Sequence, residues 1–162
     1  LLDEVPIDAV RFLFNMREAG STMDFDLGLA VEQSSQNPVY YCQYAHARIC
    51  SILRKLENDG ITPRTPERSE LMKLSSEEEK DLIMHISSLP GTIILAAKTY
   101  DPAKITHYAV ELAAKFHRFY NAQRVMCEDE QLMQARIFLC KCTKTVMKNV
   151  LSMLKVGAPE SM

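Results

Sequence analysis

The sequence predicts an all-α protein, a helical bundle of six or seven helices. Apolar residues recur at helical spacing through most of the 162 residues. Helix-start signals precede several of these runs, such as Asn37 before Pro38 and Asp101 before Pro102. The one ambiguous apolar stretch, residues 93–100, lies between two helical patterns and has no partner strand, so we interpret it as helix.

Composition places the chain among globular proteins of one domain. Apolar residues make up 47% and charged residues 25%, and a length of 162 residues supports a single domain over 1–162 with a full core. No run approaches 18 apolar residues, so we expect no membrane segment. Five cysteines without paired spacing indicate reduced thiols and a cytoplasmic protein. The opening Leu1–Pro6 lacks both a secretory signal and an initiator Met, so we expect a piece of a longer protein.

The first half of the chain predicts three helices and a loop. The first helix opens at Pro6–Asp8 and ends at Gly20, and a short second helix is capped by Asp24 or Asp26 and ends at Val31. The third runs from Pro38, after the Asn37 cap, to the stop signal at Asn58–Gly60. Two prolines and many charges between Gly60 and Lys73 predict a loop.

The second half predicts further helices with short joins. Ser75 and Ser76 are each followed by a glutamate three residues later, a tandem capping-box signal for a helix to about Ser88. Residues 89–91, Leu-Pro-Gly, should interrupt the chain before the helix at 93–100. Another helix follows Pro102, and a connection at 124–129 leads to the last and longest helix, 130–155, which Gly157 and Pro159 terminate.

The third helix carries two stripes of side chains. A core stripe comprises Cys42, Ala45, Ile49, Ile52, Leu53 and Leu56. The flanking stripe comprises Tyr41, Tyr44, Arg48, Ser51 and Lys55. Its tyrosines are either core-edge residues with wet hydroxyls or a platform on which unpaired bases stack beside a cation. From this helix alone the core-edge interpretation is the more common one.

Two later features resemble that flank. Tyr120 and Arg124 are four residues apart near a predicted helix end and repeat the pairing of Tyr44 with Arg48. Lys141, Lys144, Lys148 and Lys155 share one predicted face of the last helix. That face is either solvated or a track for phosphates. The net charge of −2 counts against nucleic acid, but residues 131–162 hold five basic side chains and one acidic one.

Motifs for catalysis are missing from the sequence. It has no Gly-rich phosphate loop, nucleophile elbow or zinc-protease helix, and no recognisable acid–base carboxylate pair. The four histidines are scattered, which suits packing or surface positions. Cys140 and Cys142 have no neighbouring ligand, so we predict neither a metal site nor a cofactor.

Several runs resemble the C-terminal anticodon-binding domain of bacterial arginyl-tRNA synthetase, in order and over essentially the whole chain. Asp8–Phe12 is similar to the "DALR" signature of such domains, with Val10 in place of its Leu. The most specific matches are Gln43-Tyr44-Ala45-His46-Ala47-Arg48 and the ending Ala158–Met162, in which Ser161 stands where the family often has a basic residue. Similar runs are Phe14–Arg17, Asn37–Cys42 and Phe116–Asn121.

The resemblance implies a helical anticodon-binding fold of class I aminoacyl-tRNA synthetases and a role in gripping the anticodon loop of arginine tRNA. The parent enzyme would join arginine to that tRNA with ATP, in a catalytic domain of the same polypeptide that this sequence lacks. The fragment alone should be inactive and monomeric. Positions that match the family's pocket are Tyr41, Tyr44, Arg48, Tyr120 and Met162. The rival hypothesis is a helical protein-interaction module without RNA binding.

Overall fold

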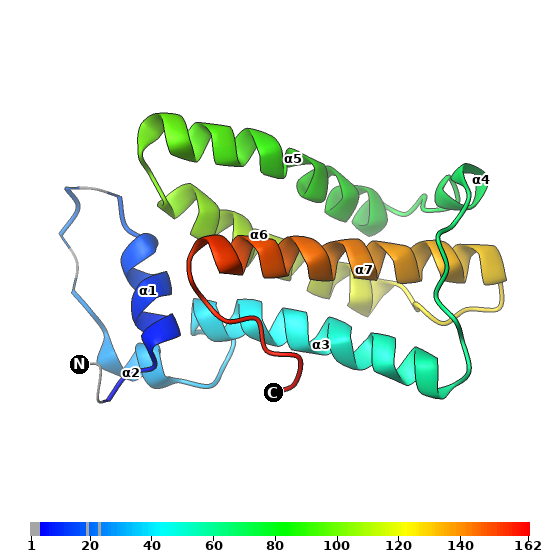
Figure 1. Cartoon of the computed structure of the whole chain (residues 1–162), viewed down its shortest axis with the longest axis horizontal. Coiled ribbons are helices and arrows are strands. Elements are labelled where there is room, and N and C mark those ends of the chain that lie inside the picture. Colours follow the sequence, from blue (N-terminus) through cyan, green and yellow to red (C-terminus); the bar gives the residue numbers. More distant parts are fainter. Residues whose placement is uncertain (1–3, 19, 23) are drawn as a thin grey trace.

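The computed structural model describes residues 4–18, 20–22 and 24–162, and within them the chain is all-α (Figure 1). The seven helices of this described part confirm the predicted bundle. The first three residues of the opening run, which was predicted to lack a secretory signal, lie outside the described part. The helices are α1 Ile7–Asn15, α2 Leu27–Val31, α3 Pro38–Asn58, α4 Arg68–Leu71, α5 Glu77–Thr99, α6 Ala103–Ala122 and α7 Glu130–Met153.

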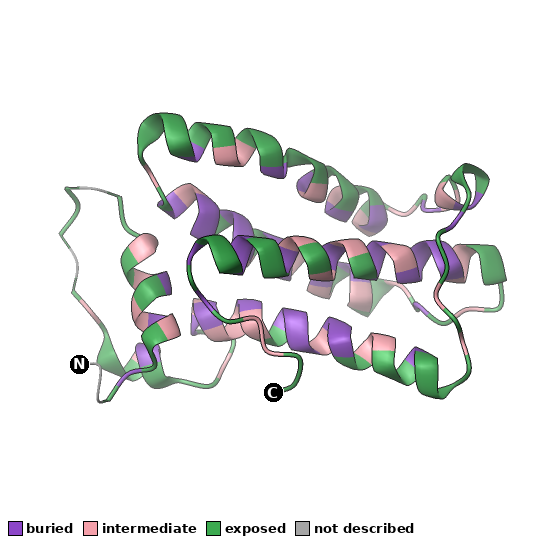
Figure 2. Cartoon of the chain, viewed as in Figure 1, coloured by how far each residue is buried: buried purple, intermediate pink, exposed green. Residues whose placement is uncertain are grey.

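The long helices α3, α6 and α7 pack lengthwise and enclose the core, while α5 lies along α6 (Figure 1). The short α1 and α2 sit at the end of the bundle where α3 begins, and α4 contacts α7 at the opposite end. Buried positions face inward from all the long helices, whereas much of α5 is exposed (Figure 2). Phe12, Ile49, Leu112, Phe116 and Ile137 are among the fully buried side chains.

Helix α3 begins and ends as the sequence predicts. The side chain of Asn37 accepts a hydrogen bond from the Val39 N–H at 3.2 Å, which satisfies a donor of the first turn, and Pro38 occupies that turn without needing a partner. Gly60 follows the helix with φ +76°, a conformation that favours glycine. The predicted core stripe is confirmed, since its members are buried or pack against the core.

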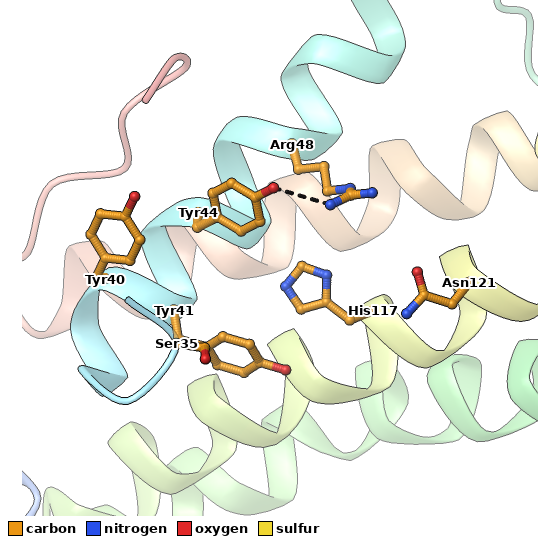
Figure 3. A pocket seen from close by; sticks show the side chains of 7 residues that line it. All are labelled: Ser35, Tyr40, Tyr41, Tyr44, Arg48, His117 and Asn121. Carbon is orange, nitrogen blue, oxygen red and sulfur yellow. Dashed lines mark hydrogen bonds between the residues drawn. The ribbon is translucent and has the colours of Figure 1, made fainter. Parts of the chain in front are cut away.

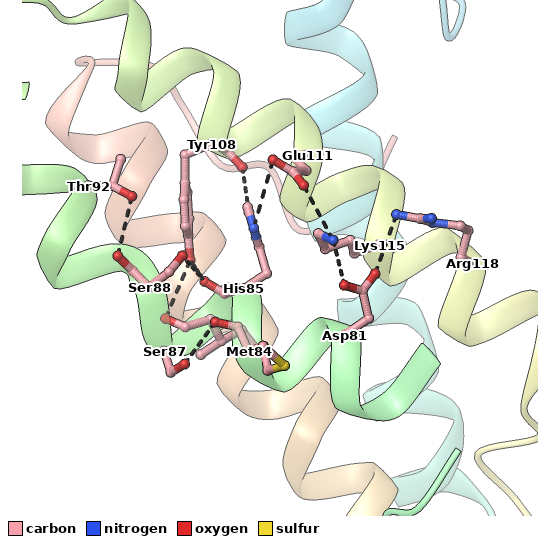
Figure 4. Close-up of polar contacts among 11 residues, drawn as sticks. Asp81, Met84, His85, Ser87, Ser88, Thr92, Tyr108, Glu111, Lys115 and Arg118 are labelled. Carbon is pink, nitrogen blue, oxygen red and sulfur yellow. Dashed lines mark hydrogen bonds and ion pairs between the residues drawn. The ribbon is translucent and has the colours of Figure 1, made fainter. Parts of the chain in front are cut away.

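Helix α5 runs through Pro90, so the predicted break at residues 89–91 was wrong. Proline removes one backbone donor, and the carbonyl of Ile86 loses its usual partner four residues on. A hydroxyl from the neighbouring helix compensates: Oη of Tyr108 lies 2.9 Å from the His85 carbonyl and 3.5 Å from that of Ile86 (Figure 4). The His85 ring stacks on Tyr108 with centroids 4.2 Å apart and its Nε2 contacts the Tyr108 carbonyl. The tertiary contact therefore keeps the helix continuous.

Charged contacts fix the first turns of α5. Ser76 and Glu79 form the predicted capping box. Glu79 is 1% exposed and accepts a hydrogen bond from Nε of Arg136 at 2.7 Å, which joins α5 to α7. A second pair, Asp81 with Lys115 at 2.7 Å, joins α5 to α6 and lowers the pKa of the Asp81 carboxyl through a hydrogen bond (Figure 4).

Three boundaries differ from the sequence prediction. Helix α1 ends at Asn15, before the predicted stop at Gly20. The predicted loop 60–73 contains the one-turn helix α4, which Glu70 stabilises by capping it and by pairing with Arg64. Helix α7 ends at Met153, so Lys155 lies beyond it.

Helix α5 is long and apolar enough to cross a membrane by length and composition, with a mean hydropathy of 1.3 over a stretch of 18 residues. The sequence pattern predicted no such segment. The ion pairs of α5 to α6 and α7 are instead those of a helix packed in a bundle. All five cysteines are free, and no group of three His, Cys, Asp or Glu side chains suited to a metal occurs in the described part of the chain.

Candidate functional site

A row of adjoining hollows follows the groove between α3 and α6. The first, which we call the His117 pocket, is lined by Ser35, Tyr40, Tyr41, Tyr44, Arg48, His117 and Asn121 and has a volume of about 450 Å³ (Figure 3). Tyr41, Tyr44 and Arg48 face it together, as their spacing of three and four residues on one helix predicts. The predicted flank of α3 therefore opens onto a hollow surface.

Aromatic rings form the wall of the His117 pocket. The Tyr44 ring is nearly parallel to Tyr40, with planes 7° apart, and stacks on His117 with centroids 5.9 Å apart. The centroids of the Tyr41 and His117 rings lie 5.1 Å apart with their planes tilted by 43°. Tyr41 is half-buried and packs on the core. Tyr41 is thus a core-edge residue whose ring also lines the pocket.

The second hollow, the Met162 pocket, shares Tyr44 and Arg48 with the first. It has a volume of about 460 Å³, and Tyr120 and Met162 line it together with those two residues. The guanidinium of Arg48 donates to the Tyr44 hydroxyl at 3.0 Å and lies 4.6 Å from the centroid of the Tyr120 ring. Residues from α3, from the end of α6 and from the chain terminus thus meet in one place, whereas Tyr41, the fifth member of the predicted pocket, lines the His117 pocket instead.

Arg124 occupies a third hollow, shared with Ile52, Lys55 and Tyr120. Arg124 was predicted to pair with Tyr120 at helical spacing, but α6 ends at Ala122. The cation that stacks on Tyr120 is Arg48. The carbonyl of Arg124 accepts a hydrogen bond from the buried Arg136 at 2.7 Å, which anchors this connection to α7.

The predicted lysine row forms one side of a groove between α3 and α7. Lys141, Lys144 and Lys148 line it from α7, and Arg54 lines it from α3. We call this set the lysine groove. Lys144 approaches Glu160 at 3.5 Å, while Lys141 and Lys148 are exposed. Lys155 does not continue the row, because it follows the helix end with φ +56°.

Burial shifts the pKa values of His117 and Tyr41 in the His117 pocket. It lowers the pKa of His117 below its ordinary value, and the nearby charge of Arg48 lowers it further. Burial likewise raises the pKa of the Tyr41 hydroxyl. His117 is therefore neutral at physiological pH, and its Nε2 is buried without a hydrogen-bond partner among the described residues. Neutral rings beside a single guanidinium suit stacking and charge recognition rather than proton transfer.

Several residues of these hollows were not predicted from the sequence. Tyr40 and His117 line the first pocket, and Arg54 lies in the lysine groove. Tyr40 directly precedes Tyr41, and Arg54 lies four residues before Asn58. Both are on the helix that the sequence pattern singled out, so the same pattern could have identified them. The position of His117 depends on how α6 packs against α3, which the sequence pattern does not encode.

The family model of the DALR anticodon binding domain matches residues 42–162, most of the chain. The chain belongs to this family. The Asp8–Phe12 run, which resembles the family's signature, precedes the matched residues.

Relatives of known name agree with this assignment. The chain is 51% identical over its full length to the arginine–tRNA ligase of Caldanaerobacter subterraneus subsp. tengcongensis and 48% identical to that of Ruminiclostridium cellulolyticum, and covers 29% of each. The solved arginyl-tRNA synthetase of Thermus thermophilus is 28% identical, with a TM-score of 0.80 over 96% of this chain and 26% of that one. The chain thus spans less than a third of the length of these relatives.

Proposed function

We propose that this domain binds the anticodon loop of arginine tRNA, as the C-terminal domain of an arginyl-tRNA synthetase. One observation carries the proposal: Tyr44, Arg48, Tyr120 and Met162, from three separate parts of the chain, line one pocket in a member of an anticodon-binding family. An unpaired base needs a flat partner, a cation and an apolar wall, and these residues supply all three.

Each part of the surface has a distinct role in this proposal. Tyr41 and Tyr44 offer rings to bases in the His117 pocket, and Tyr120 and Met162 bound the second base site. Arg124 borders the third hollow and contributes a cation to the loop. The lysine groove binds phosphates without regard to sequence, with Lys141, Lys144 and Lys148 as donors and Lys155 as an outlying charge.

The rest of the enzyme supplies the chemistry. In this proposal residues 1–162 form one helical domain, and a catalytic domain of the same polypeptide uses ATP to join arginine to the tRNA. The domain itself holds no cofactor, works as a monomer and belongs in the cytoplasm. Arginine-dependent exchange between ATP and pyrophosphate should stay at background for this chain alone, and exchange above background would contradict the assignment.

Filter binding with arginine tRNA and with an unrelated tRNA tests the central claim. Wild type should prefer arginine tRNA, and Tyr41→Ala, Tyr44→Ala and deletion of Met162 should each weaken binding by about one to two decades. Tyr100→Ala is the matched control, since Tyr100 is 90% exposed at the far end of α5. Its affinity should equal that of wild type.

Thermal melts of the same variants separate binding from folding. Deletion of Met162 should leave the melting temperature unchanged, because Met162 is a chain end and 54% exposed. If the tyrosine variants melt early but bind normally once folded, the tyrosines serve the core alone. Equal and weak binding of both tRNAs by wild type would instead favour the protein-interaction module.

A further inference from the structure

The last residues of the chain lie across α3 without secondary structure of their own (Figure 1). We call residues 154–162 the tail. Leu154 and Val156 are buried at its start, and Met162 ends it in the pocket with Tyr44 and Arg48. An irregular segment of this kind is ordered only by contacts to the rest of the protein.

Helix α1 holds the first part of the tail. The Gly157 N–H donates to Oδ2 of Asp8 at 3.0 Å, and Nη1 of Arg11 donates to the Lys155 carbonyl at 2.8 Å. Nε2 of Gln43, from α3, donates both to the same Asp8 oxygen and to the Gly157 carbonyl, each at 3.0 Å. Both backbone polar groups of Gly157 are thereby bound by side chains from two helices.

Helix α3 holds the second part. Nδ1–H of His46 donates to the Pro159 carbonyl at 2.8 Å, and Nη2 of Arg54 donates to the Glu160 carbonyl at 3.0 Å. Ala47 and Cys50, two of the α3 residues between these donors, have small side chains and line hollows beside the tail, which lets the tail lie close to the helix. Almost all of these contacts engage the backbone of the tail, so they fix its path rather than its side chains.

We propose that Asp8, Arg11 and Gln43 form a clasp that positions the tail so that Met162 completes the pocket with Tyr44, Arg48 and Tyr120. The clasp rests on the proposed RNA-binding function and names positioning residues for it, none of which touches the pocket itself. Without the clasp the tail keeps the contacts of His46 and Arg54 but loses those at its start, so it becomes more mobile. RNA binding must then include the entropic cost of ordering it again. Helix α1 thereby controls a site at the opposite terminus of the chain.

Gly157 is the tightest point of the clasp. A Cβ added there would lie 3.0 Å from Oδ2 of Asp8, closer than side chains normally approach. Gly157→Ala should push the carboxylate away and open the clasp without altering α1. Asp8→Ala removes the acceptor outright, whereas Asp8→Asn keeps an oxygen that accepts from the Gly157 N–H and should have a smaller effect.

The first readout is independent of RNA. The methyl resonance of Met162, labelled with carbon-13, should be shifted by Tyr44 and Tyr120, the rings of its pocket. In Asp8→Ala and Gly157→Ala it should move toward the position of an unfolded chain, with an intermediate shift in Asp8→Asn. Asp24→Ala, an exposed acid of the same terminal region, is the matched control and should leave the resonance in place. An unmoved resonance in both clasp variants would overturn the proposal.

The second readout is affinity for an arginine tRNA transcript. Opening the clasp should weaken binding about tenfold in the intact chain but cause no further loss once Met162 is deleted, because the clasp acts through that residue. Additive losses, or a moved resonance with unchanged affinity, would contradict a positioning role. If wild type fails to bind the transcript, the proposed function fails, and the methyl resonance still decides whether the clasp exists.

Discussion

The guanidinium of Arg48 lies over the ring of Tyr120, 4.6 Å from its centroid. The two residues are far apart in the sequence and come from α3 and α6. Because a planar cation on an aromatic face is pre-organised, it presents its remaining donors toward the neighbouring pocket at little entropic cost. The contact thus links the packing of two helices to the proposed binding surface.

We expect Arg48→Lys to weaken binding of arginine tRNA almost as much as Arg48→Ala. Lysine keeps the charge but loses the planar group that stacks on Tyr120 and donates to Tyr44. Tyr120→Phe should retain wild-type affinity, whereas Tyr120→Ala should cost ~1–3 kcal/mol. Titrations at one fixed salt concentration measure these differences, and wild-type affinity of Arg48→Lys would show that charge alone matters.

A double-substitution cycle isolates the stack itself. The coupling between Arg48→Ala and Tyr120→Ala in tRNA affinity should be about 0.5–1 kcal/mol, the range of an exposed cation–aromatic pair. The pair of Arg48→Ala with Tyr100→Ala is the control, because Tyr100 is exposed beside α5, and its effects should add. Additive effects in the first cycle would mean that the two residues act separately.

Local patterns predicted much of this fold. Asn37 and the Ser76–Glu79 box cap their helices as expected, because capping depends on residues two or three apart along the chain. The break predicted at Pro90 was wrong, because the Tyr108 hydroxyl that satisfies the freed carbonyls comes from another helix. The buried pair of Glu79 and Arg136 was equally hidden, since the segment between these residues carries no sign of it.

The residues of the candidate site also differ in how far the sequence could predict them. One helix sets the relation of Tyr41, Tyr44 and Arg48, so their shared face followed from spacing alone. The cation that stacks on Tyr120 could not be predicted from spacing, because Arg124 lies past the end of α6 and Arg48 comes from α3. Only the family resemblance pointed to Met162, whose place depends on backbone contacts of the tail that leave no mark on the sequence.

The lysine groove should contribute affinity that is independent of RNA sequence. Replacing Lys141, Lys144 and Lys148 with alanine should flatten the dependence of log affinity on log salt by about 0.7–0.9 for each phosphate that is no longer bound. Cognate and unrelated tRNA should weaken about equally. Lys144 should matter least of the three, because Glu160 already lies 3.5 Å from it.

A control of equal charge makes this prediction specific. Arg68, Lys80 and Lys98 are exposed on α4 and α5, away from the groove. Their triple alanine variant loses the same three charges and should keep the wild-type salt slope. An unchanged slope in the Lys141, Lys144 and Lys148 variant would instead assign those lysines to a solvated face.

Tyr108→Phe should destabilise the protein by about 1 kcal/mol. The substitution keeps the ring that stacks on His85 but removes the hydroxyl that serves the carbonyls of His85 and Ile86 beside Pro90. Urea unfolding measures the change, and Tyr100→Phe is the exposed control. In a Pro90→Ala background the loss of stability should be smaller, because the new N–H donates to the Ile86 carbonyl. An equal loss in both backgrounds would show that the hydroxyl stabilises the protein independently of Pro90.

His46 and His117, whose Nε2 atoms are buried, should make stability depend on pH near neutrality. Burial lowers the pKa of His46 and of His117, and the unpartnered Nε2 atoms of both rings have no acceptor for a proton among the described residues. In the unfolded chain both titrate near 6.5, so below that pH the unfolded state binds more protons than the native state. The free energy of unfolding should therefore be constant above about pH 7.5 and fall as the pH drops from about 6.5 toward the lowered native values.

Asparagine at position 46 tests this dependence with little change in geometry. In His46→Asn the amide nitrogen replaces Nδ1 as the donor to the Pro159 carbonyl, and no group remains to titrate. Urea unfolding between about pH 8 and pH 5 should then give a shallower decline than wild type. His107 is exposed, and His107→Asn should retain the wild-type decline.

The decline in wild type should be separate from acid unfolding. Ion pairs lower the pKa of carboxylates such as Asp81 and Asp129, so these groups lose their contribution to stability only below about pH 4. Equal slopes for wild type and His46→Asn would show that this histidine accepts a proton in the folded chain.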